Sequence, residues 1–492
     1  MAVTSFLFLV LALVASVIFR ILPQKYRAPW LLLISVVFLG TWNWTFMLIL
    51  ALFGITNYWL GFKVEQTLPS GKRLWLLTGI LLNILVLFVF KYNHFFLPSF
   101  LQLLGIQADN GALQILLPVG LSFLVVQMIS YLVDVANKRL PAEHNLISFG
   151  VYTLYFPKLL SGPVERARIF LPSLQNPLPF DRSLLNRSLS LIILGVLRKL
   201  VFANPLFSLV PQAVFTTPLE LPGQNLWLYL FAYAFALFND FAGYTGIVRG
   251  ISLWFGIEMS SNFNLPYFSR NFTEFWNRWH SSLSAWLRDY LFFPISRSLM
   301  KRFARRDHIL TLLVPPMATM LVSGLWHGVS WSLLVWGGLH GLYLVLERLP
   351  GLFLPSPPLD ERPLWRQLLG MGITFLLTLF AWIPFRMDLP TSLQFFKGLF
   401  IYIRPDFELF DRYITGDAVF LSWTPLNLPN PLLILLLAAA LVFDLLLVRR
   451  SGEKDLWSLP RWVQAGLIVI LFVAAFSTLF VDAAAPFVYQ AF

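Results

Sequence analysis

Long, nearly uninterrupted apolar runs limit the possible folds of this chain more than any other feature. Only Asp444 interrupts the run from Leu432 to Val448, and the run from Gln464 to Phe480 contains no charged residue. A helix needs about 20 apolar residues to cross a bilayer, whereas strands of a membrane β-barrel show about ten residues of alternating polarity. Because these runs do not alternate, and because lipid cannot satisfy an open backbone, they predict transmembrane helices.

The composition of the whole chain also indicates an integral membrane protein. Hydrophobic residues make up 58% of the 492 positions and charged residues 12%, about half the charged share of soluble domains. A soluble globule could not cover itself with so few charges, and a disordered chain would be far poorer in apolar residues. We therefore expect an all-α polytopic membrane protein with about eleven transmembrane helices, within a range of about 9 to 13, plus re-entrant or interfacial helices.

Basic residues gather in loops, and their positions predict how the chain is oriented. The 36 Lys and Arg exceed the 24 Asp and Glu, which gives a net charge of +12. Basic loops contain Arg20, Lys25 and Arg27, then Lys63, Lys72 and Arg73, then Lys138 and Arg139. Counting crossings places these loops on one side, which the positive-inside rule makes cytoplasmic, with the N-terminus opposite. The positive balance therefore indicates membrane orientation, and we expect no nucleic-acid partner.

The first apolar stretch and the cysteine count exclude several alternatives. Ser5 to Leu22 has no basic segment before it and no small-residue cleavage site, so it predicts a retained helix rather than a signal peptide. The chain has no cysteine, which excludes disulfides, a cysteine nucleophile, a cysteine-bound acyl intermediate and cysteine-ligated zinc. We also expect no metal site, because the histidines within the apolar part of the chain lack short metal-ligand spacing.

Three segments do not match an ordinary span. Trp30 to Leu60 is too long for one helix, and the stretch from Gly40 to Asn43 predicts a break within it. Ile147 to Leu174 is apolar but interrupted by Gly and Pro, and such backbone at membrane depth requires cover by protein or a water-filled cavity. Asn262 to Pro294 is the third segment, and in it Asn271 is a plausible N-cap with Glu274 three residues later.

The helix expected after Asn271 is aromatic and amphipathic. Its broad aromatic face would contain Phe272, Trp276, Trp279, Leu283, Trp286 and Tyr290, and its other faces Arg278, Ser282, Arg288 and Asp289. Such a helix either lies at the membrane interface or dips into a solvent-filled funnel.

Histidines within apolar segments are candidate functional groups, because polar side chains at membrane depth are costly. His94 and His144 lie in loops and His308 in a basic run, so we expect these three at the surface. His327, between Gly324 and Gly328, either forms a packing hydrogen bond across helices or acts as a general base.

The remaining polar candidates depend on tertiary packing. His340 follows His327 by thirteen residues, about 20 Å along a continuous helix, so we expect it to be structural or near the interface. His280 lies in the aromatic segment and can meet His327 only through tertiary packing. Asp240, inside an apolar span, either orients an imidazole or an arginine or caps a broken helix.

A series of motifs resembles the membrane-bound O-acyltransferase family, specifically its bacterial alginate O-acetylation branch. They are Leu117-Pro-Val-Gly-Leu-Ser-Phe123, Ile129-Ser-Tyr-Leu-Val-Asp134, Phe156-Pro-Lys-Leu-Leu-Ser-Gly-Pro163, Asp240-Phe-Ala-Gly-Tyr244, Asn262-Phe-Asn-Leu-Pro-Tyr267, Glu274-Phe-Trp-Asn-Arg-Trp-His280, Ser284-Ala-Trp-Leu-Arg-Asp-Tyr290, Gly324-Leu-Trp-His-Gly328 and Trp336-Gly-Gly338. The part beyond matches more weakly, through Trp382-Ile-Pro-Phe-Arg386 and Pro486-Phe-Val-Tyr-Gln-Ala-Phe492. The resemblance implies one acyltransferase domain over residues 1–492, with a motif-dense core at 115–348 and a weaker helical part at 349–492.

The resemblance also implies a fold and a set of site residues. The fold is a ring of tilted helices around a central funnel and tunnel. His327 matches the catalytic histidine of the family, and His280 matches a second functional histidine. Further tunnel or substrate-binding candidates are Asp240, Trp276, Trp279, Arg288, Asp289, Trp326 and Arg166. The sequence departs from the family pattern at Gly246, where a second acid is usual, at Glu165 and at Asn277.

The function implied is O-acyl transfer in a bacterial plasma (inner) membrane. The expected donor substrate is acetyl-CoA from the cytoplasm, which the basic run from Arg297 to Arg306 would attract, and no cofactor is bound permanently. The expected acceptor is an exported polysaccharide, reached directly or through an extracytoplasmic acetyltransferase or esterase-like partner. The alternatives are D-alanyl transfer to teichoic acid from a carrier protein and, in a different class, a transporter or channel.

Overall fold

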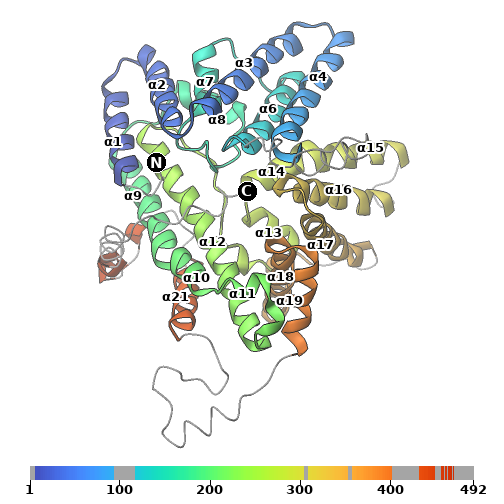
Figure 1. Ribbon diagram of the computed structural model, residues 1–492. Coiled ribbons are helices and arrows are strands. Elements are labelled where there is room, and N and C mark those ends of the chain that lie inside the picture. The colour runs from blue at the N-terminus through green and yellow to red at the C-terminus, as the bar shows by residue number, and fades with distance from the viewer. Residues whose placement is uncertain are drawn as a thin grey trace, which may run out of the picture. The chain divides into compact units, whose positions relative to one another are not determined.

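Every regular element in the described part of the chain is a helix (Figure 1). The structure, a computed structural model, describes residues 6–93, 117–303, 309–352, 357–401 and 431–448, residues 456–458 and most of 460–469. The expected all-α class is confirmed for these residues. His94, His308, the end of the basic run at Arg305 and Arg306, and the last motif lie outside them.

The described chain divides into two compact units. Unit 1 consists of the residues up to Gly195 together with Tyr244–Ser261, and unit 2 of Val196–Gly243 and the residues from Asn262 onward. The helices of unit 1 are α1 (Phe6–Ile21), α2 (Gln24–Trp42), α3 (Trp44–Gln66), α4 (Pro69–Leu87), η1 (Phe88–Tyr92), α6 (Leu121–Ala136), α7 (Leu146–Leu154), α8 (Ala167–Gln175) and most of α9 (Arg182–Leu197). The expectation of a single domain stays a prediction.

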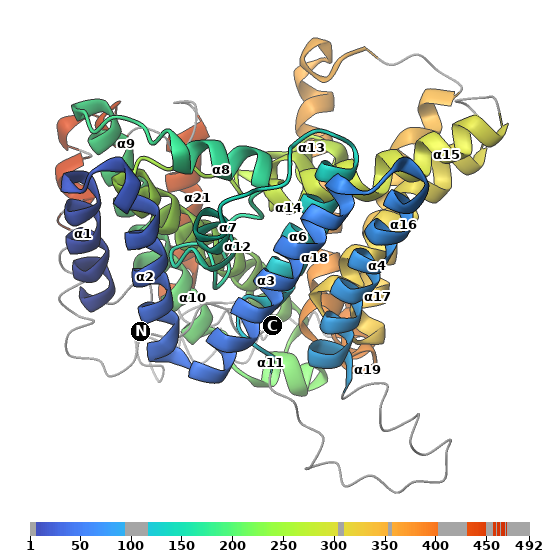
Figure 2. The same ribbon diagram turned by 90° about the horizontal axis from the view of Figure 1, so that it is seen from above.

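Unit 2 contains most of the motifs that the sequence singles out. Its helices are η2 (Arg198–Ala203), α10 (Asn204–Leu209), α11 (Ala213–Thr216), η3 (Pro218–Glu220), the first part of α12 (Gly223–Trp254), η4 (Pro266–Phe268), α13 (Phe272–Arg278), α14 (Ser281–Leu287), η5 (Arg288–Phe292), α15 (Phe293–Phe303), α16 (Ile309–His327), α17 (Trp331–Arg348), η6 (Leu349–Leu352), η7 (Leu359–Glu361), α18 (Leu364–Arg386), α19 (Leu389–Ile401), α21 (Pro431–Val448) and η8 (Leu456–Ser458). Figures 1 and 2 both show α16 and α17 side by side.

Six helices in the described residues are long and apolar enough to cross a membrane. They are Trp44–Gln66, Gly71–Tyr92, Arg182–Leu209, Gly223–Trp254, Ile309–His327 and Leu364–Arg386, and three shorter apolar helices are Leu7–Ile21, Leu121–Ala136 and Pro431–Leu447. The chain is therefore a multi-pass membrane protein, while the count of eleven spans and the central funnel stay predictions.

The break expected between residues 40 and 43 lies at Asn43. This residue has an extended backbone, ends α2 and caps α3, because its side chain accepts a hydrogen bond from the Phe46 amide at 3.0 Å. Asn57 of α3 and Asn83 of α4 then bond to each other in the interior of unit 1, at 2.7 Å. Such buried amide pairs hold apolar helices together in lipid.

The interrupted segment between residues 147 and 174 forms two nine-residue helices, α7 and α8, joined by a buried turn. Protein groups cover this irregular backbone, which is the condition for such backbone within a membrane. Lys158 donates to Gln127 Oε1 at 2.5 Å, and Glu165 accepts from the amide and hydroxyl of Ser260 at 2.6 and 3.2 Å. The Ser161 amide donates to the Tyr244 hydroxyl at 3.1 Å. The prediction that this segment is not an ordinary span is confirmed.

Candidate active site

The site is built on a helical hairpin made of α16 and α17. The first helix ends at His327, and Ser330 begins the second by accepting a hydrogen bond from the Leu333 amide at 3.2 Å. Glycines bring the two backbones together, since a Cβ added at Gly324 would lie 2.3 Å from the Leu333 carbonyl oxygen and one at Gly337 2.4 Å from that of Met320. The hairpin therefore fixes His327 at a tight turn against α17.

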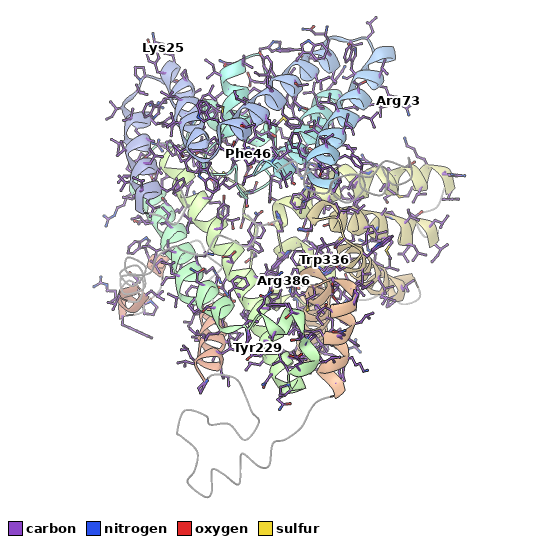
Figure 3. The ribbon with its side chains drawn as sticks, in the orientation of Figure 1. Lys25, Phe46, Arg73, Tyr229, Trp336 and Arg386 are labelled. Atoms are coloured by element: carbon purple, nitrogen blue, oxygen red, sulfur yellow. The ribbon has the colours of Figure 1, made fainter. Side chains whose placement is uncertain are left out.

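Aromatic rings enclose His327, which is 5% exposed. Its imidazole centroid lies 5.0 Å from those of Trp326 and Trp336, and 5.3 Å from that of Phe385 on α18. Trp336 lies within unit 2 (Figure 3). Such surroundings shield the imidazole from water, and a neutral imidazole can accept a proton.

His280 lies at a break that the sequence did not predict. The expected single aromatic helix is wrong, because it divides into α13 and α14 at Trp279 and His280, and His280 has left-handed backbone angles of φ 41° and ψ 48°. Asn262 stabilises the break, since its carbonyl accepts from the Ser281 amide at 2.9 Å and its side chain accepts from the Ser282 hydroxyl. The predicted N-cap at Asn271 is confirmed, with the Glu274 amide at 2.7 Å.

The break turns His280 into the interior, where it is 1% exposed. Its ring lies 4.9 Å from Phe241 and 6.3 Å from Trp326 between centroids. Trp326 in turn contacts His327, so one indole links the two histidines that sequence reasoning could not place relative to each other. Burial lowers the pKa of His280 to about 3, which keeps this imidazole neutral at ordinary pH.

His340 is not where the sequence placed it. The estimate of about 20 Å from His327 assumed a continuous helix, but the chain reverses between His327 and Trp331. His340 is fully buried, and its ring centroid lies 5.0 Å from those of Trp336 and Trp276. Since Trp336 also contacts His327, it separates the two imidazoles. Gly328 and Ser330, a glycine followed by an N-cap residue, were the available signal for this turn.

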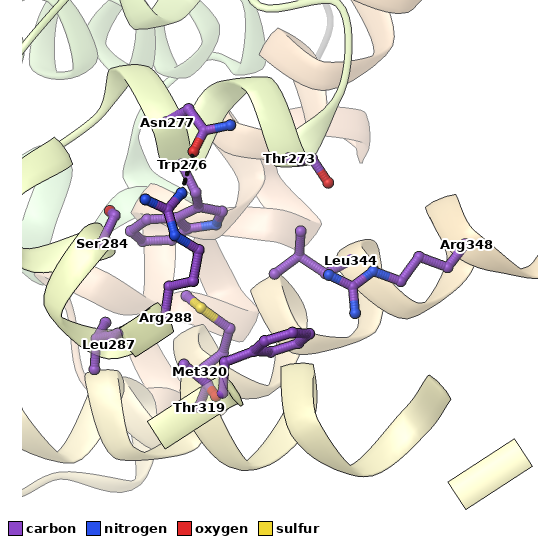
Figure 4. A pocket seen from close by; sticks show the side chains of 11 residues that line it. Thr273, Trp276, Asn277, Ser284, Leu287, Arg288, Thr319, Met320, Leu344 and Arg348 are labelled. Atoms are coloured by element: carbon purple, nitrogen blue, oxygen red, sulfur yellow. Dashed lines mark hydrogen bonds between the residues drawn. The ribbon is translucent and has the colours of Figure 1, made fainter. Parts of the chain in front are cut away.

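A cavity of about 140 Å³ opens beside Trp276 (Figure 4). It is lined by Thr273, Trp276, Asn277, Ser284, Leu287, Arg288, Phe292, Thr319, Met320, Leu344 and Arg348. Arg288 and Arg348 stand on opposite sides of the space in Figure 4, and Arg288 donates to Asn277 Oδ1 at 2.9 Å. Arg348 lies over the Phe292 ring at 4.9 Å. The cavity is thus largely apolar with two guanidinium groups, a combination that suits a ligand with an apolar arm and an anionic part.

The other predicted site residues fall in different places. Trp279 is buried against Phe275 and Trp382 rather than in the cavity, and Asp289 lies 3.9 Å from the Arg288 guanidinium. Arg166 belongs to unit 1, where it precedes α8.

Asp240 lies in a buried cluster of opposite charges in unit 2. It pairs with Lys199 at 2.5 Å, and the adjacent Arg198 pairs with Asp444 at 2.9 Å and donates to Asn239 at 2.6 Å. All the charged side chains in these pairs are at most 2% exposed. Asp240 thus neutralises a lysine on η2, a partner that the sequence did not suggest.

Sequence reasoning also missed several residues of the site. Trp336 and Trp382 stood in quoted motifs without an assigned role, and nothing in the sequence distinguished Arg348 from a basic helix end. Among the described residues, no group of three His, Cys, Asp or Glu side chains is placed to hold a metal ion.

The sequence also matches a known protein family. The model of the MBOAT, membrane-bound O-acyltransferase, family matches residues 81–383. The chain belongs to this family. It is therefore a membrane-bound O-acyltransferase, an enzyme rather than a transporter or channel, and the resemblance found in the motifs is confirmed.

Three curated proteins similar to this chain have names that specify different acceptors. A probable alginate O-acetylase AlgI of Azotobacter vinelandii is 33% identical over 81% of this chain and 77% of its own length. A peptidoglycan O-acetyltransferase of Helicobacter pylori is 29% identical over 75% of this chain and 73% of its own. A teichoic acid D-alanyltransferase of Streptococcus thermophilus is 32% identical over 57% of this chain and 72% of its own.

Proposed function

We propose that this MBOAT protein transfers acetyl groups from cytoplasmic acetyl-CoA to hydroxyls of an exported polysaccharide, directly or through an extracytoplasmic partner. The observation that carries the proposal is the buried meeting of His280 and His327 around Trp326, beside a cavity with two guanidinium groups. The similarity to an alginate O-acetylase and a peptidoglycan O-acetyltransferase supports acetyl as the group transferred.

In this proposal His327 is the general base. Its buried imidazole removes the proton from an acceptor hydroxyl as that oxygen attacks the acyl carbon, a role typically worth about 10²- to 10⁴-fold in rate. His280, held neutral by burial, orients the acceptor or donates a hydrogen bond to developing charge. Since the chain has no cysteine, the acyl group passes directly to the acceptor or to a nucleophile of a partner.

Coenzyme A carries phosphates on a flexible, partly apolar arm, and we assign it to the cavity beside Trp276. Arg288 and Arg348 would bind its anionic part. Exposed basic residues of α15, namely Arg297, Lys301 and Arg302, would raise its concentration near the protein.

Purified protein in liposomes tests the proposal. With radiolabelled acetyl-CoA and an O-deacetylated alginate or peptidoglycan fragment as acceptor, label is expected in an alkali-labile ester, and hydroxylamine treatment should release it. If the purified partner protein is required, its addition should restore transfer. Absence of any labelled ester with either acceptor, with and without a partner, would contradict the proposal.

A second candidate function is D-alanyl transfer to teichoic acid, favoured by the similarity to a D-alanyltransferase. Its donor would be a thioester on a carrier protein. The same liposomes, supplied with a D-alanyl-loaded carrier and lipoteichoic acid, distinguish the two. Transfer of D-alanine without transfer of acetyl would replace the first proposal by the second.

A further inference from the structure

Four buried side chains around Trp336 leave polar atoms without hydrogen-bond partners in the described residues. We name Trp276, Trp336, Trp382 and His340 the indole cluster. The ring centroid of Trp336 lies 5.9 Å from that of Trp276, 6.4 Å from that of Trp382 and 5.0 Å from that of His340. The Nε1 atoms of the three tryptophans and both ring nitrogens of His340 are buried, and no described residue accepts from or donates to them.

Two other tryptophans show the usual arrangement, whereas the buried Nε1 of Trp42 in unit 1, like those of the indole cluster, has no described partner. The Trp30 indole donates to the Ala15 carbonyl at 2.9 Å, and the Trp227 indole donates to the Leu399 carbonyl at 3.2 Å. Buried polar groups are normally paired in this way, and a group of exceptions at one place needs an explanation. Because all four side chains of the indole cluster touch at Trp336, one cause is sufficient for the set.

The cluster offers mainly donors. Each indole supplies one N–H, and a neutral His340 supplies one donor and one acceptor. A ligand that satisfies it must therefore present an acceptor oxygen. Trp336 is fully buried and contacts His327, while Trp276 lines the cavity assigned above to the donor. The cluster thus lies between that cavity and His327, where the acyl group would react.

We propose that the indole cluster binds the carbonyl oxygen of the thioester donor and stabilises the oxyanion formed during transfer, with the Trp336 N–H as its central donor. This inference rests on the proposed acyl transfer and adds the group that carries the negative charge. N–H groups aimed at an oxyanion in a site without water are among the strongest contributions to acyl transfer.

The reaction is balanced as follows. The acceptor hydroxyl oxygen bonds to the acyl carbon, its proton passes to His327, and the carbonyl π electrons move onto the oxygen held by the indole cluster. When the C=O bond re-forms, the C–S bond breaks with its electron pair on sulfur. The proton on His327 goes to the thiolate, leaving an ester, a free thiol and a neutral imidazole.

The Trp336→Phe variant tests the inference, since it removes the N–H and keeps an aromatic ring. We expect kcat to fall roughly 100-fold while the KM for acetyl-CoA changes by less than about threefold. The matched control is Trp227→Phe, whose indole already has a carbonyl partner, and its kcat should stay near that of the wild type. An unchanged kcat in a folded Trp336→Phe protein would overturn the inference.

A spectroscopic measurement keeps the inference separate from the proposed function. A ketone analogue of acetyl-CoA with a ¹³C-labelled carbonyl, bound to the wild type, should show its carbonyl stretch at lower frequency than when bound to Trp336→Phe. Identical bands would exclude a hydrogen bond from Trp336. If the wild type binds the analogue with a shifted band but transfers no acetyl group, the proposed function fails and the binding role of the cluster stands.

Discussion

At the scale of single residues, burial decides what the histidines can do. His280 and His327 are each almost fully enclosed by rings, which shields them from water. Burial also lowers the pKa of His280. The motifs identified both residues before the structure placed them. Their meeting at Trp326 could not be predicted, because it depends on the left-handed backbone of His280 and on its tertiary contact with Trp326. Neither feature produces a periodic sequence pattern.

The free energy of unfolding should depend on pH because His280 is buried. Its pKa is about 3 in the folded protein, against 6.5 for an ordinary histidine. Below pH 6.5 the unfolded chain binds a proton that the folded chain does not, so stability falls as the pH falls, by about 2 kcal/mol at pH 5. Asparagine tolerates left-handed angles, so His280→Asn should remove this part of the pH dependence. Thermal unfolding in detergent between pH 5 and 7 measures it, and equal slopes for both proteins would contradict it.

At the scale of elements, the close packing of α16 and α17 depends on glycines of both helices. A Cβ at Gly337 would meet the Met320 carbonyl oxygen at 2.4 Å, whereas one at Gly338 would meet only the end of Leu321 at 4.0 Å. We expect Gly337→Ala to destabilise the protein by about 1–3 kcal/mol through overpacking. The neighbouring Gly338→Ala should be neutral or stabilise by up to about 1 kcal/mol. Unfolding temperatures of the two variants test this, and equal effects would show that the hairpin does not need Gly337.

The buried pair of Lys199 and Asp240 connects η2 to α12. Lys199→Met leaves a buried carboxylate without its cation, and we expect a loss of about 3–5 kcal/mol. The double variant with Asp240→Leu should recover most of it, since it buries no charge. The exposed pair of Arg187 and Glu258 is the control, and its disruption should cost less than about 1 kcal/mol. A Lys199→Met protein as stable as the wild type would contradict the assignment.

The all-α class and some helix ends could be predicted from the length of the apolar runs and from cap residues, as at Asn43 and Asn271. The breaks inside predicted helices could not be predicted in this way. No Gly or Pro stands beside His280 in the sequence to indicate a break, and aromatic residues continue at helical spacing on both sides of it. Lys199 follows Arg198 directly in the sequence, yet its charge is neutralised inside the protein. Both cases are tertiary effects, in which distant residues override the local pattern.

At the scale of the whole molecule, the basic loops predict the orientation in the membrane. Lys25 and Thr41 are exposed residues near opposite ends of α2. The chain contains no cysteine, so each single-cysteine variant can be labelled without background. Lys25→Cys should react with a membrane-impermeant maleimide only from the cytoplasmic side, and Thr41→Cys only from the other. Labelling of both from the same side of intact cells and inverted vesicles would contradict the predicted topology.

The most direct test of the central claim, that His327 is the general base of acetyl transfer, compares its alanine variant with the wild type. Initial rates of labelled acetyl transfer are measured in liposomes, with His144→Ala, an exposed histidine of unit 1, as the control. We expect His327→Ala to remain folded, with a cooperative unfolding transition, and to lose about 10²- to 10⁴-fold in kcat, while His144→Ala keeps full activity. A folded His327→Ala protein that transfers acetyl at the wild-type rate would contradict the claim.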